Sequence, residues 1–339
     1  MQAFTYNHYG PPEVLQPQEV DQPTPKPNEI LIRIHATTVS SGDWRMRSLE
    51  VPAGFGLIIR LVAGIRRPRQ PILGTELAGV VEAVGGEVSR FKIGDPVVGF
   101  SDTAMGCHAE YRCLPEDGAV AAKPSTLSFE EAAALCFGGT TALDFLRRAK
   151  LQRGERVLIN GASGSVGTAA VQLARHIGAE VSGVCSTANL DLVRSLGATH
   201  VIDYTQQDFT QNGNRYDVIL DAVGTAPFKR CRRSLKPGGR LLLLVADLPA
   251  MLLSGWQSLI SGRRVIAGPA TVRPEDVATL ADLAETGAYR PVMDRCYPFE
   301  QMVAAHRYVD TGRKRGNVVV RLDPEPRLDP APLRNVMGA

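Results

Sequence analysis

Residues 161–167, with the sequence GASGSVG, have the residue types and spacing of a phosphate-binding turn. Gly164 would let the backbone approach a pyrophosphate, and Gly167 would let the following helix pack closely on the preceding strand. Ala162 stands at the first position of this pattern, where the chain turns tightly. The amides at the start of the helix would offer donors and a positive dipole end to the phosphates. We predict a dinucleotide site, the alternative being a tight turn without a ligand.

The residues that follow the next predicted strand, 180–185, indicate whether the site prefers NAD or NADPH. Sites for NAD usually place Asp or Glu about 20 residues after the glycines, where the acid binds the ribose hydroxyls. Here Ser186 and Thr187 follow Cys185, and no acid stands among them. An acid would repel a 2′-phosphate, whereas small hydroxyls would accept one, so we predict NADPH. Ser186 and Thr187 could equally cap the following helix, and one residue can serve both roles.

Further residues around these two turns complete the predicted cofactor site. Asn189, Arg194 and Tyr204 lie near enough in sequence to contact the 2′-phosphate. The full set that we expect to bind the cofactor is Thr141, Ala162, Ser163, Gly164, Ser165, Val166, Gly167, Ser186, Thr187, Asn189, Tyr204, Val223 and Asn317.

The elements around the glycine turn alternate between strands and helices. RVLIN (156–160) reads as a short buried strand, and apolar residues spaced by three and one along 166–177 predict a helix that ends at Gly178. EVSGVC (180–185) is the next strand, and a short helix follows over 188–196. Further strands are predicted in THVIDY, YDVILDAVG and GRLLLLVA. Such alternation indicates βαβ units and a parallel sheet.

The first 120 residues instead read as a strand-rich unit with proline-rich and glycine-rich turns. Its predicted strands are 29–39, 77–85, 95–100 and 108–114. NVVVRL (317–322) is predicted to be a strand that returns to this first unit. We therefore expect one domain at 1–124, completed by about 268–322, and a second at 125–267. The Pro-rich tail 323–339 is expected to be disordered.

Residues 45–70 combine an apolar middle with Arg60, Arg66, Arg67 and Arg69. This composition fits an amphipathic helix on a membrane surface, or a helical cap over a cleft with solvated arginines. Because the formal net charge of the chain is only +3, we favour the cap.

Composition narrows the classes of protein further. A length of 339 residues fits two domains, and a net charge of +3 gives no reason to expect a nucleic-acid partner. The six cysteines form no CxxC pair, and the N-terminus has no secretion-signal pattern, so we expect reduced thiols and a cytoplasmic protein. No apolar run reaches the ~18 residues that would predict membrane insertion.

Several segments carry a family resemblance. INGASGSVGTAAVQLARHIGA, RSLGATHVIDY and DVILDAVG resemble the medium-chain dehydrogenase/reductase superfamily, and GTELAGVVEAVGGEVSRFKIGDPVVGF resembles its GroES-like domain. Within that superfamily the chain most resembles the zinc-independent, zeta-crystallin-like quinone oxidoreductases. The resemblance implies a β-rich GroES-like catalytic domain and a Rossmann domain with a doubly wound parallel sheet, with the nicotinamide in the cleft between them. We also expect a homodimer acting on a small molecule.

The positions that would hold catalytic zinc in the alcohol dehydrogenases differ here. They fall at Ser40, at Thr75 and near Phe137, next to Cys136, which do not make a zinc site, so we expect no metal. By the same resemblance Ser40 and Thr75 would line the catalytic space. Asp43 follows on the same loop and could relay a proton, although we favour an ion pair with Arg47. Trp44 could stack on a flat quinone or simply pack.

A site without zinc favours acceptors that are already electrophilic. A quinone or an α,β-unsaturated carbonyl compound accepts a hydride at carbon and leaves an oxyanion that hydrogen bonds can stabilise. We therefore predict an NADPH-dependent reductase of such compounds, with Ser40, Asp43, Trp44 and Thr75 as candidate catalytic residues. The alternatives are a metal-independent alcohol or aldehyde oxidoreductase and an NADPH-binding scaffold without catalysis.

Overall fold

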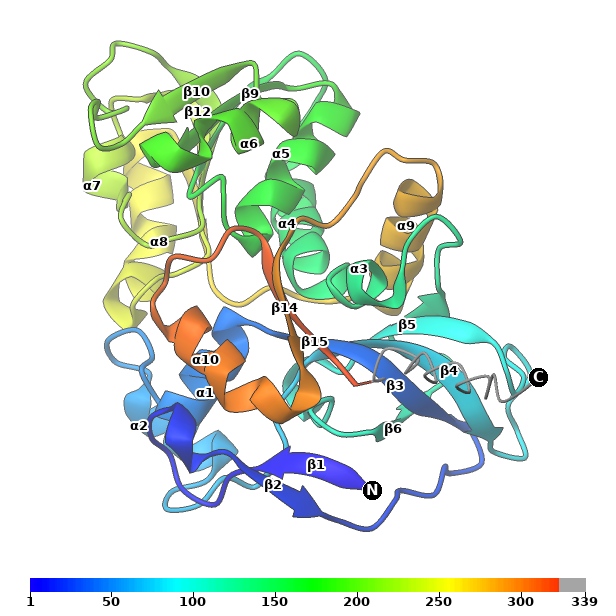
Figure 1. Cartoon of the computed structure of the whole chain (residues 1–339). Coiled ribbons are helices and arrows are strands. Elements are labelled where there is room, and N and C mark those ends of the chain that lie inside the picture. Colours follow the sequence, from blue (N-terminus) through cyan, green and yellow to red (C-terminus); the bar gives the residue numbers. More distant parts are fainter. Residues whose placement is uncertain (323–339) are drawn as a thin grey trace, which may run out of the picture.

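The computed structural model describes residues 1–322, and the predicted disordered tail 323–339 lies outside this range. Two large sheets carry the described part of the chain, the lower and the upper one in Figure 1. No helix within residues 1–322 is both long and apolar enough to cross a bilayer.

The first sheet has seven strands and is mostly antiparallel. Its order is β14-β15-β3-β4-β5-β7, with β6 paired to β3. The C-terminal strand pairs antiparallel with β3, Val318 opposite Val39, so its predicted return to the first unit is confirmed. The strands of this sheet, with the small β1–β2 hairpin beside it, are β1 (Gln2–Thr5), β2 (Gln16–Glu19), β3 (Glu29–Val39), β4 (Glu76–Val84), β5 (Pro96–Phe100), β6 (Tyr111–Pro115), β7 (Val120–Ala122), β14 (Met293–Pro298) and β15 (Asn317–Arg321).

The second sheet has six strands, and all of them are parallel. Its order is β10-β9-β8-β11-β12-β13, so the first strand in sequence lies at the centre and the direction of winding reverses between β8 and β11. This is the doubly wound arrangement whose ligands bind beyond the carboxyl ends of the central strands. The strands are β8 (Arg156–Asn160), β9 (Glu180–Cys185), β10 (His200–Asp203), β11 (Tyr216–Asp221), β12 (Leu235–Leu243) and β13 (Arg264–Ala267). The predicted fold class is confirmed.

Helices fill the space between and around the two sheets. The helices are α1 (Ser41–Ser48), α2 (Gly56–Ala63), α3 (Phe129–Ala133), α4 (Cys136–Ala149), α5 (Ser165–Ile177), α6 (Leu190–Ser195), α7 (Phe228–Cys231), α8 (Leu248–Ser261), α9 (Pro274–Glu285) and α10 (Met302–Asp310), with 3-10 turns at η1 (Pro12–Val14), η2 (Asp102–Ala104), η3 (Thr187–Asn189) and η4 (Phe299–Gln301). Helices α3 and α4 join the sheets, because one buried cluster includes Ala78 of β4, Phe145 of α4 and Ile159 of β8. A shared core therefore fixes the cleft between the sheets.

The segment 45–70 differs from the predicted cap. It contains the end of α1 and the whole of α2, and none of the α2 residues is buried. Its apolar side chains face solvent, which a cap packed over a cleft would not allow. Helix α2 lies beside the start of α8, where the Leu248 amide donates to the Ala53 carbonyl at 3.0 Å.

Candidate active site

The glycine turn between β8 and α5 leaves open space where a phosphate would lie. A Cβ atom on Gly164 would meet nothing closer than the Gly161 carbonyl oxygen at 3.7 Å. A Cβ atom on Gly167 would lie 2.0 Å from that same oxygen, so Gly167 is needed for packing. The left-handed conformation of the turn belongs to Gly161, with φ of 85°. Each glycine thus has a separate physical role.

A basic loop runs along this turn from the other sheet. The Gly316 amide donates to the Ser163 carbonyl at 2.8 Å, which holds the residues before β15 against the turn. Arg313, Lys314 and Arg315 line a cavity of about 530 Å³. Its wall also includes Gly161, Ser163, Gly164, Cys185, Ser186, Asn189, Tyr204 and Val223. These cations were missed in the sequence, where the only signal is the run RKR before the last strand.

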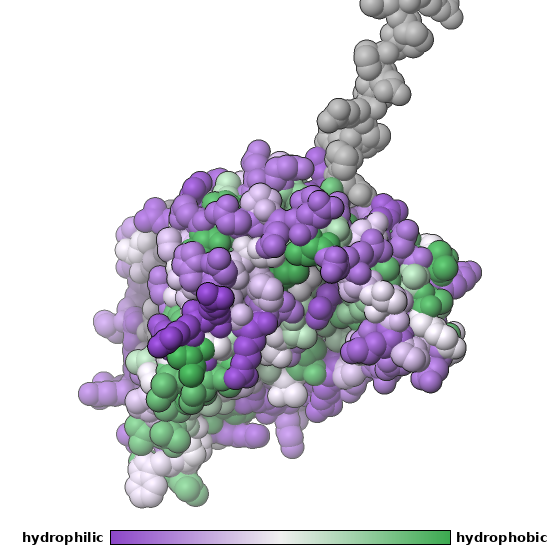
Figure 2. All heavy atoms as spheres, turned by 90° about the horizontal axis from the view of Figure 1, so that it is seen from below, coloured by the Kyte–Doolittle hydropathy of each residue, from purple (hydrophilic) through white to green (hydrophobic). Residues whose placement is uncertain are grey.

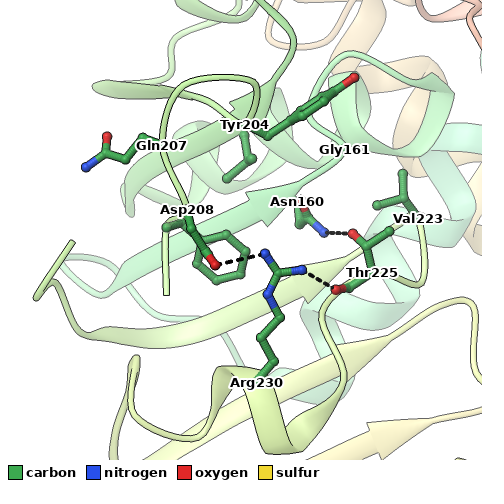
Figure 3. A pocket seen from close by; sticks show the side chains of 10 residues that line it. Asn160, Gly161, Tyr204, Gln207, Asp208, Val223, Thr225 and Arg230 are labelled. Atoms are coloured by element: carbon green, nitrogen blue, oxygen red, sulfur yellow. Dashed lines mark hydrogen bonds and ion pairs between the residues drawn. The ribbon is translucent and has the colours of Figure 1, made fainter. Parts of the chain in front are cut away.

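A second cavity of about 450 Å³ adjoins the first, and both are lined by Gly161, Tyr204 and Val223. Figure 3 shows Arg230 at its base, between Asp208 and Thr225. The Arg230 guanidinium lies 3.1 Å from the Asp208 carboxylate and donates to the Thr225 carbonyl at 2.9 Å. Tyr204 is exposed at the rim. The pair of cavities is large enough for an extended nucleotide along the carboxyl ends of the strands.

The predicted 2′-phosphate residues are only partly brought together. Ser186 and Asn189 line the larger cavity, and the Asn189 amide donates to the hydroxyls of Ser163 and Ser186 at 3.2 and 3.1 Å. The Thr187 hydroxyl instead donates to the Asp203 carboxylate at 2.6 Å. Asp203 ends β10 opposite Cys185, so an acid does stand beside this site, on the neighbouring strand. The Ser186 side chain makes no helix-capping bond.

The other predicted cofactor residues support the turn or line its edge. Ala162 is fully buried beneath the turn. The Ser165 hydroxyl donates to the Asn317 side chain, which ties α5 to β15. The Thr141 hydroxyl donates to the Phe137 carbonyl one helical turn back. Val166 lines the nearby cavity that also contains Trp44.

Ser40 and Asp43 form a closed hydrogen-bonded unit at the start of α1. The Ser40 hydroxyl donates to the Asp43 carboxylate at 2.6 Å, and the Gly74 amide donates to the same carboxylate at 2.8 Å. Arg47 lies instead against Asp310, at 2.6 Å. The predicted Asp43–Arg47 ion pair is therefore wrong, because backbone and hydroxyl donors satisfy the fully buried Asp43 and Arg47 points to α10.

Thr75 and Glu76 lie at the start of β4, facing α4. The Thr75 hydroxyl is buried and has no hydrogen-bond partner among residues 1–322. Glu76 accepts the Thr38 hydroxyl and, at 2.6 Å, the Phe137 amide. Burial raises the pKa of the Glu76 carboxyl to about 7, although these two donors oppose the shift. The Thr75 hydroxyl is thus buried and uncommitted within the described residues, and Thr75 does not line the cavities described above.

Trp44, on α1, faces the nucleotide turn. It lines a smaller cavity of about 160 Å³ together with Phe137, Gly164 and Lys314. The Lys314 ammonium donates to the Gly316 carbonyl at 2.6 Å, and desolvation lowers its pKa to about 8. An aromatic plane and a cation therefore border the space next to the glycine turn.

Comparison with known proteins identifies the family. Residues 26–125 match the alcohol dehydrogenase GroES-like domain, and residues 196–320 match the zinc-binding dehydrogenase family. The chain is 32% identical over 332 residues to a 2-methylene-furan-3-one reductase of Solanum lycopersicum, which covers 94% of this chain and 79% of the relative. The chain belongs to the medium-chain dehydrogenase/reductase superfamily, in its quinone-oxidoreductase branch. The resemblance predicted from the sequence is confirmed.

Other members of the superfamily agree with this assignment. A quinone oxidoreductase of Sus scrofa is 33% identical over 321 residues, covering 90% of this chain and 93% of the relative. The structure of the quinone oxidoreductase from Coxiella burnetii aligns with a TM-score of 0.82 at 29% identity, covering 95% of this chain and 99% of that one. As a medium-chain dehydrogenase/reductase, the protein is an oxidoreductase that binds a nicotinamide cofactor.

The family description that mentions zinc does not fit the residues of this chain. At the positions that correspond to zinc ligands, Ser40 is bonded to Asp43 and Thr75 offers a neutral hydroxyl. Cys136 is buried, and burial raises the pKa of its thiol well above the usual value. Within residues 1–322 no three His, Cys, Asp or Glu side chains come together as a metal-binding group. Zinc prefers thiolate, imidazole and carboxylate ligands, so this donor set does not suit it.

Proposed function

We propose that the protein is an NADPH-dependent reductase that transfers a hydride to a quinone or an α,β-unsaturated carbonyl compound without a metal. The observation that carries the proposal is the cavity between the open face of Gly164 and the cations Arg313, Lys314 and Arg315. Amides at the start of α5 suit the pyrophosphate, and the three cations that line the cavity outnumber the acid beside it, Asp203, so the site suits a dinucleotide that bears an additional phosphate. The names of two relatives, a 2-methylene-furan-3-one reductase and a quinone oxidoreductase, support the acceptor class.

In this mechanism the residues position the acceptor and stabilise its developing charge. The bound nicotinamide supplies the hydride. Trp44 offers a flat surface against which a quinone or enone can stack next to the glycine turn. The Thr75 hydroxyl has no partner among the described residues, and the family resemblance places Thr75 in the catalytic space, so we assign it as the donor to the oxyanion left on the acceptor. The oxyanion then takes a proton from water.

Ser40 and Asp43 act as positioning residues in this account. Because the Ser40 hydroxyl is already donated to Asp43, it is not free to donate to a substrate. Asp43 also holds the Gly74 amide, next to Thr75. The pair therefore fixes the start of α1, which carries Trp44, and the turn that carries Thr75.

Turnover of NADPH with a simple quinone or enone, in the presence of a metal chelator, tests the proposal. We expect the nicotinamide absorbance to fall with either acceptor. Thr75→Val should lower kcat by about 100-fold, as loss of an oxyanion donor does, without changing NADPH affinity. Thr75→Ser, which keeps the hydroxyl, should restore most of the activity. Consumption of NADPH with aldehydes alone would favour an alcohol dehydrogenase, and binding without turnover would favour a scaffold.

Cofactor choice is tested separately by titration with NADPH and NADH. We expect NADPH to bind at least tenfold more tightly, which corresponds to about 1.4 kcal/mol. Ser186→Asp places a carboxylate in the larger cavity and should reverse this preference. Equal affinities of the parent protein for the two cofactors would contradict the NADPH assignment.

A further inference from the structure

Two neighbouring helices expose an unusual amount of apolar surface. Helices α2 and α8 bury none of their residues. Leu57, Leu61, Trp256 and Leu259 have exposed fractions of 71, 53, 63 and 82%. We call the apolar surface of the two helices the α2–α8 face, and its exposed large side chains are Leu57, Ile58, Leu61, Val62, Ile65, Leu252, Leu253, Trp256, Leu259 and Ile260. Soluble proteins rarely leave such a set uncovered.

The spacing of these residues makes one surface of each helix apolar. Positions 57, 58, 61 and 62 fall on one side of α2, and positions 252, 253, 256, 259 and 260 fall on one side of α8. The start of α8 contacts the turn that precedes α2, where Leu248 lies against Ala53 and Gly54. Seen from below, apolar side chains gather at one corner of the molecule, on the side where α2 and α8 lie in Figure 1 (Figure 2).

The charge around the α2–α8 face is predominantly positive, with Glu50 before α2 and Asp247 at the start of α8 as the flanking acids. Residues 51–75 contain Arg60, Arg66, Arg67 and Arg69 but no Asp or Glu. Residues 248–264 likewise contain Arg263 and Arg264 but no acid. The whole chain carries only +3, so the rest of the chain is net negative and the positive charge is concentrated beside this face. An apolar surface flanked by arginines is complementary to a bilayer surface with anionic headgroups.

We propose that the α2–α8 face docks on the surface of a membrane that contains anionic lipids. The apolar side chains would enter the boundary between headgroups and acyl chains, and the arginines would lie at the level of the phosphates. A second copy of the chain is a poorer occupant, because a two-fold contact would bring six arginines of each copy together with only Glu50 and Asp247 beside them, and Asp247 already caps α8. The proposal does not depend on the reductase activity.

Sedimentation with lipid vesicles tests the proposal on the full-length protein. We expect binding to vesicles of phosphatidylcholine and phosphatidylglycerol in equal parts, and at least tenfold weaker binding to phosphatidylcholine alone. Salt at about 1 M, where the Debye length is about 3 Å, should also weaken binding. Leu61→Gln with Leu259→Gln, and separately Arg66→Gln with Arg67→Gln, should each reduce the partition coefficient at least tenfold. NADPH affinity should stay unchanged in both double variants.

Ile93→Gln is the matched control, because Ile93 is 65% exposed on the loop between β4 and β5, away from the α2–α8 face. This variant should bind vesicles like the parent protein. Failure of the parent protein to bind anionic vesicles would overturn the proposal. Light scattering that shows a dimer converted to a monomer by Leu61→Gln with Leu259→Gln would also overturn it, since a second copy would then cover the face.

Discussion

Gly164 and Gly167 lie three residues apart in one turn but have different physical tasks. Gly164 has an ordinary φ of −80° and open space at its Cβ position. Gly164→Val should therefore leave the fold intact, with a stability loss of about 1 kcal/mol from the poorer helix start, while blocking the approach of a pyrophosphate. We expect near-complete loss of NADPH binding in a fluorescence titration, with a melting curve by circular dichroism close to that of the parent.

Gly167→Val provides the contrast. Its Cβ would collide with the Gly161 carbonyl oxygen at 2.0 Å, so this variant should unfold or lose most of its stability. A folded Gly164→Val variant with undiminished NADPH affinity would mean that the turn holds no phosphate.

Arg313 and Arg315 are the residues that we expect to supply much of the phosphate attraction. Replacing both with Gln should weaken NADPH binding at least tenfold and reduce its dependence on salt, because exposed charges are screened. Arg307→Gln is a suitable control, since Arg307 pairs with Glu13 at 2.6 Å on the outside of α10. Unchanged NADPH affinity in the double variant would show that the basic loop does not contact the cofactor.

The sequence predicted which residues lie near the site better than it predicted the hydrogen-bond partners of their side chains. The sequence placed Ser40 and Asp43 together, but it could not show that the Ser40 hydroxyl is donated to Asp43. It placed Thr187 near the cofactor, whereas the pairing of β9 with β10 brings Asp203 to its hydroxyl. A side chain's partner depends on strands and helices distant in sequence, and neither spacing nor composition encodes these contacts.

Helices and strands with a strong local sequence pattern were predicted with nearly the observed bounds. β3, β8 and β9 have the predicted bounds, and α5 begins one residue earlier than predicted and ends before Gly178 as expected. Weaker patterns were less exact: the short helix predicted over 188–196 is present as a 3-10 turn at Thr187–Asn189 followed by α6, whereas the cap predicted within 45–70 contains the exposed α2. The physical difference is burial, because strand and helix patterns are clear only where one side is covered by the core.

Helix α4 depends on a carboxyl group that belongs to β4. Glu76 accepts the Phe137 amide in the first turn of α4, and its pKa is raised to about 7 by burial. The folded state therefore holds a proton that the unfolded state loses, so the free energy of unfolding should fall as pH rises from about 5 to 8. Glu76→Gln should remove most of this fall, on the order of 2 kcal/mol.

Urea unfolding of the parent and the Glu76→Gln variant at both ends of this pH range measures the effect. The amide can still accept from Phe137 and donate to Thr38, so the variant keeps both contacts. Equal pH dependence in the two proteins would show that Glu76 does not titrate in this range.

At the scale of the whole molecule, the site exists because the C-terminal strand returns to the first sheet. Pairing of β15 with β3 carries Arg313, Lys314 and Arg315 to the glycine turn more than 140 residues earlier in the chain. The sequence predicted the return of this strand, and yet the three cations before it were overlooked. The domain boundaries at 124 and 267 stay a prediction, since α3 and α4 share a core with both sheets.

The central claim is direct hydride transfer from NADPH to an electrophilic carbon. The most direct measurement uses NADPH with deuterium at both C4 positions of the nicotinamide and an enone acceptor, with the product analysed by mass spectrometry and NMR. We expect one deuterium at the β-carbon of the reduced product for each NADPH consumed, in the presence of a chelator. NADPH consumption without deuterium in the product, or no reaction until zinc is added, would contradict the account.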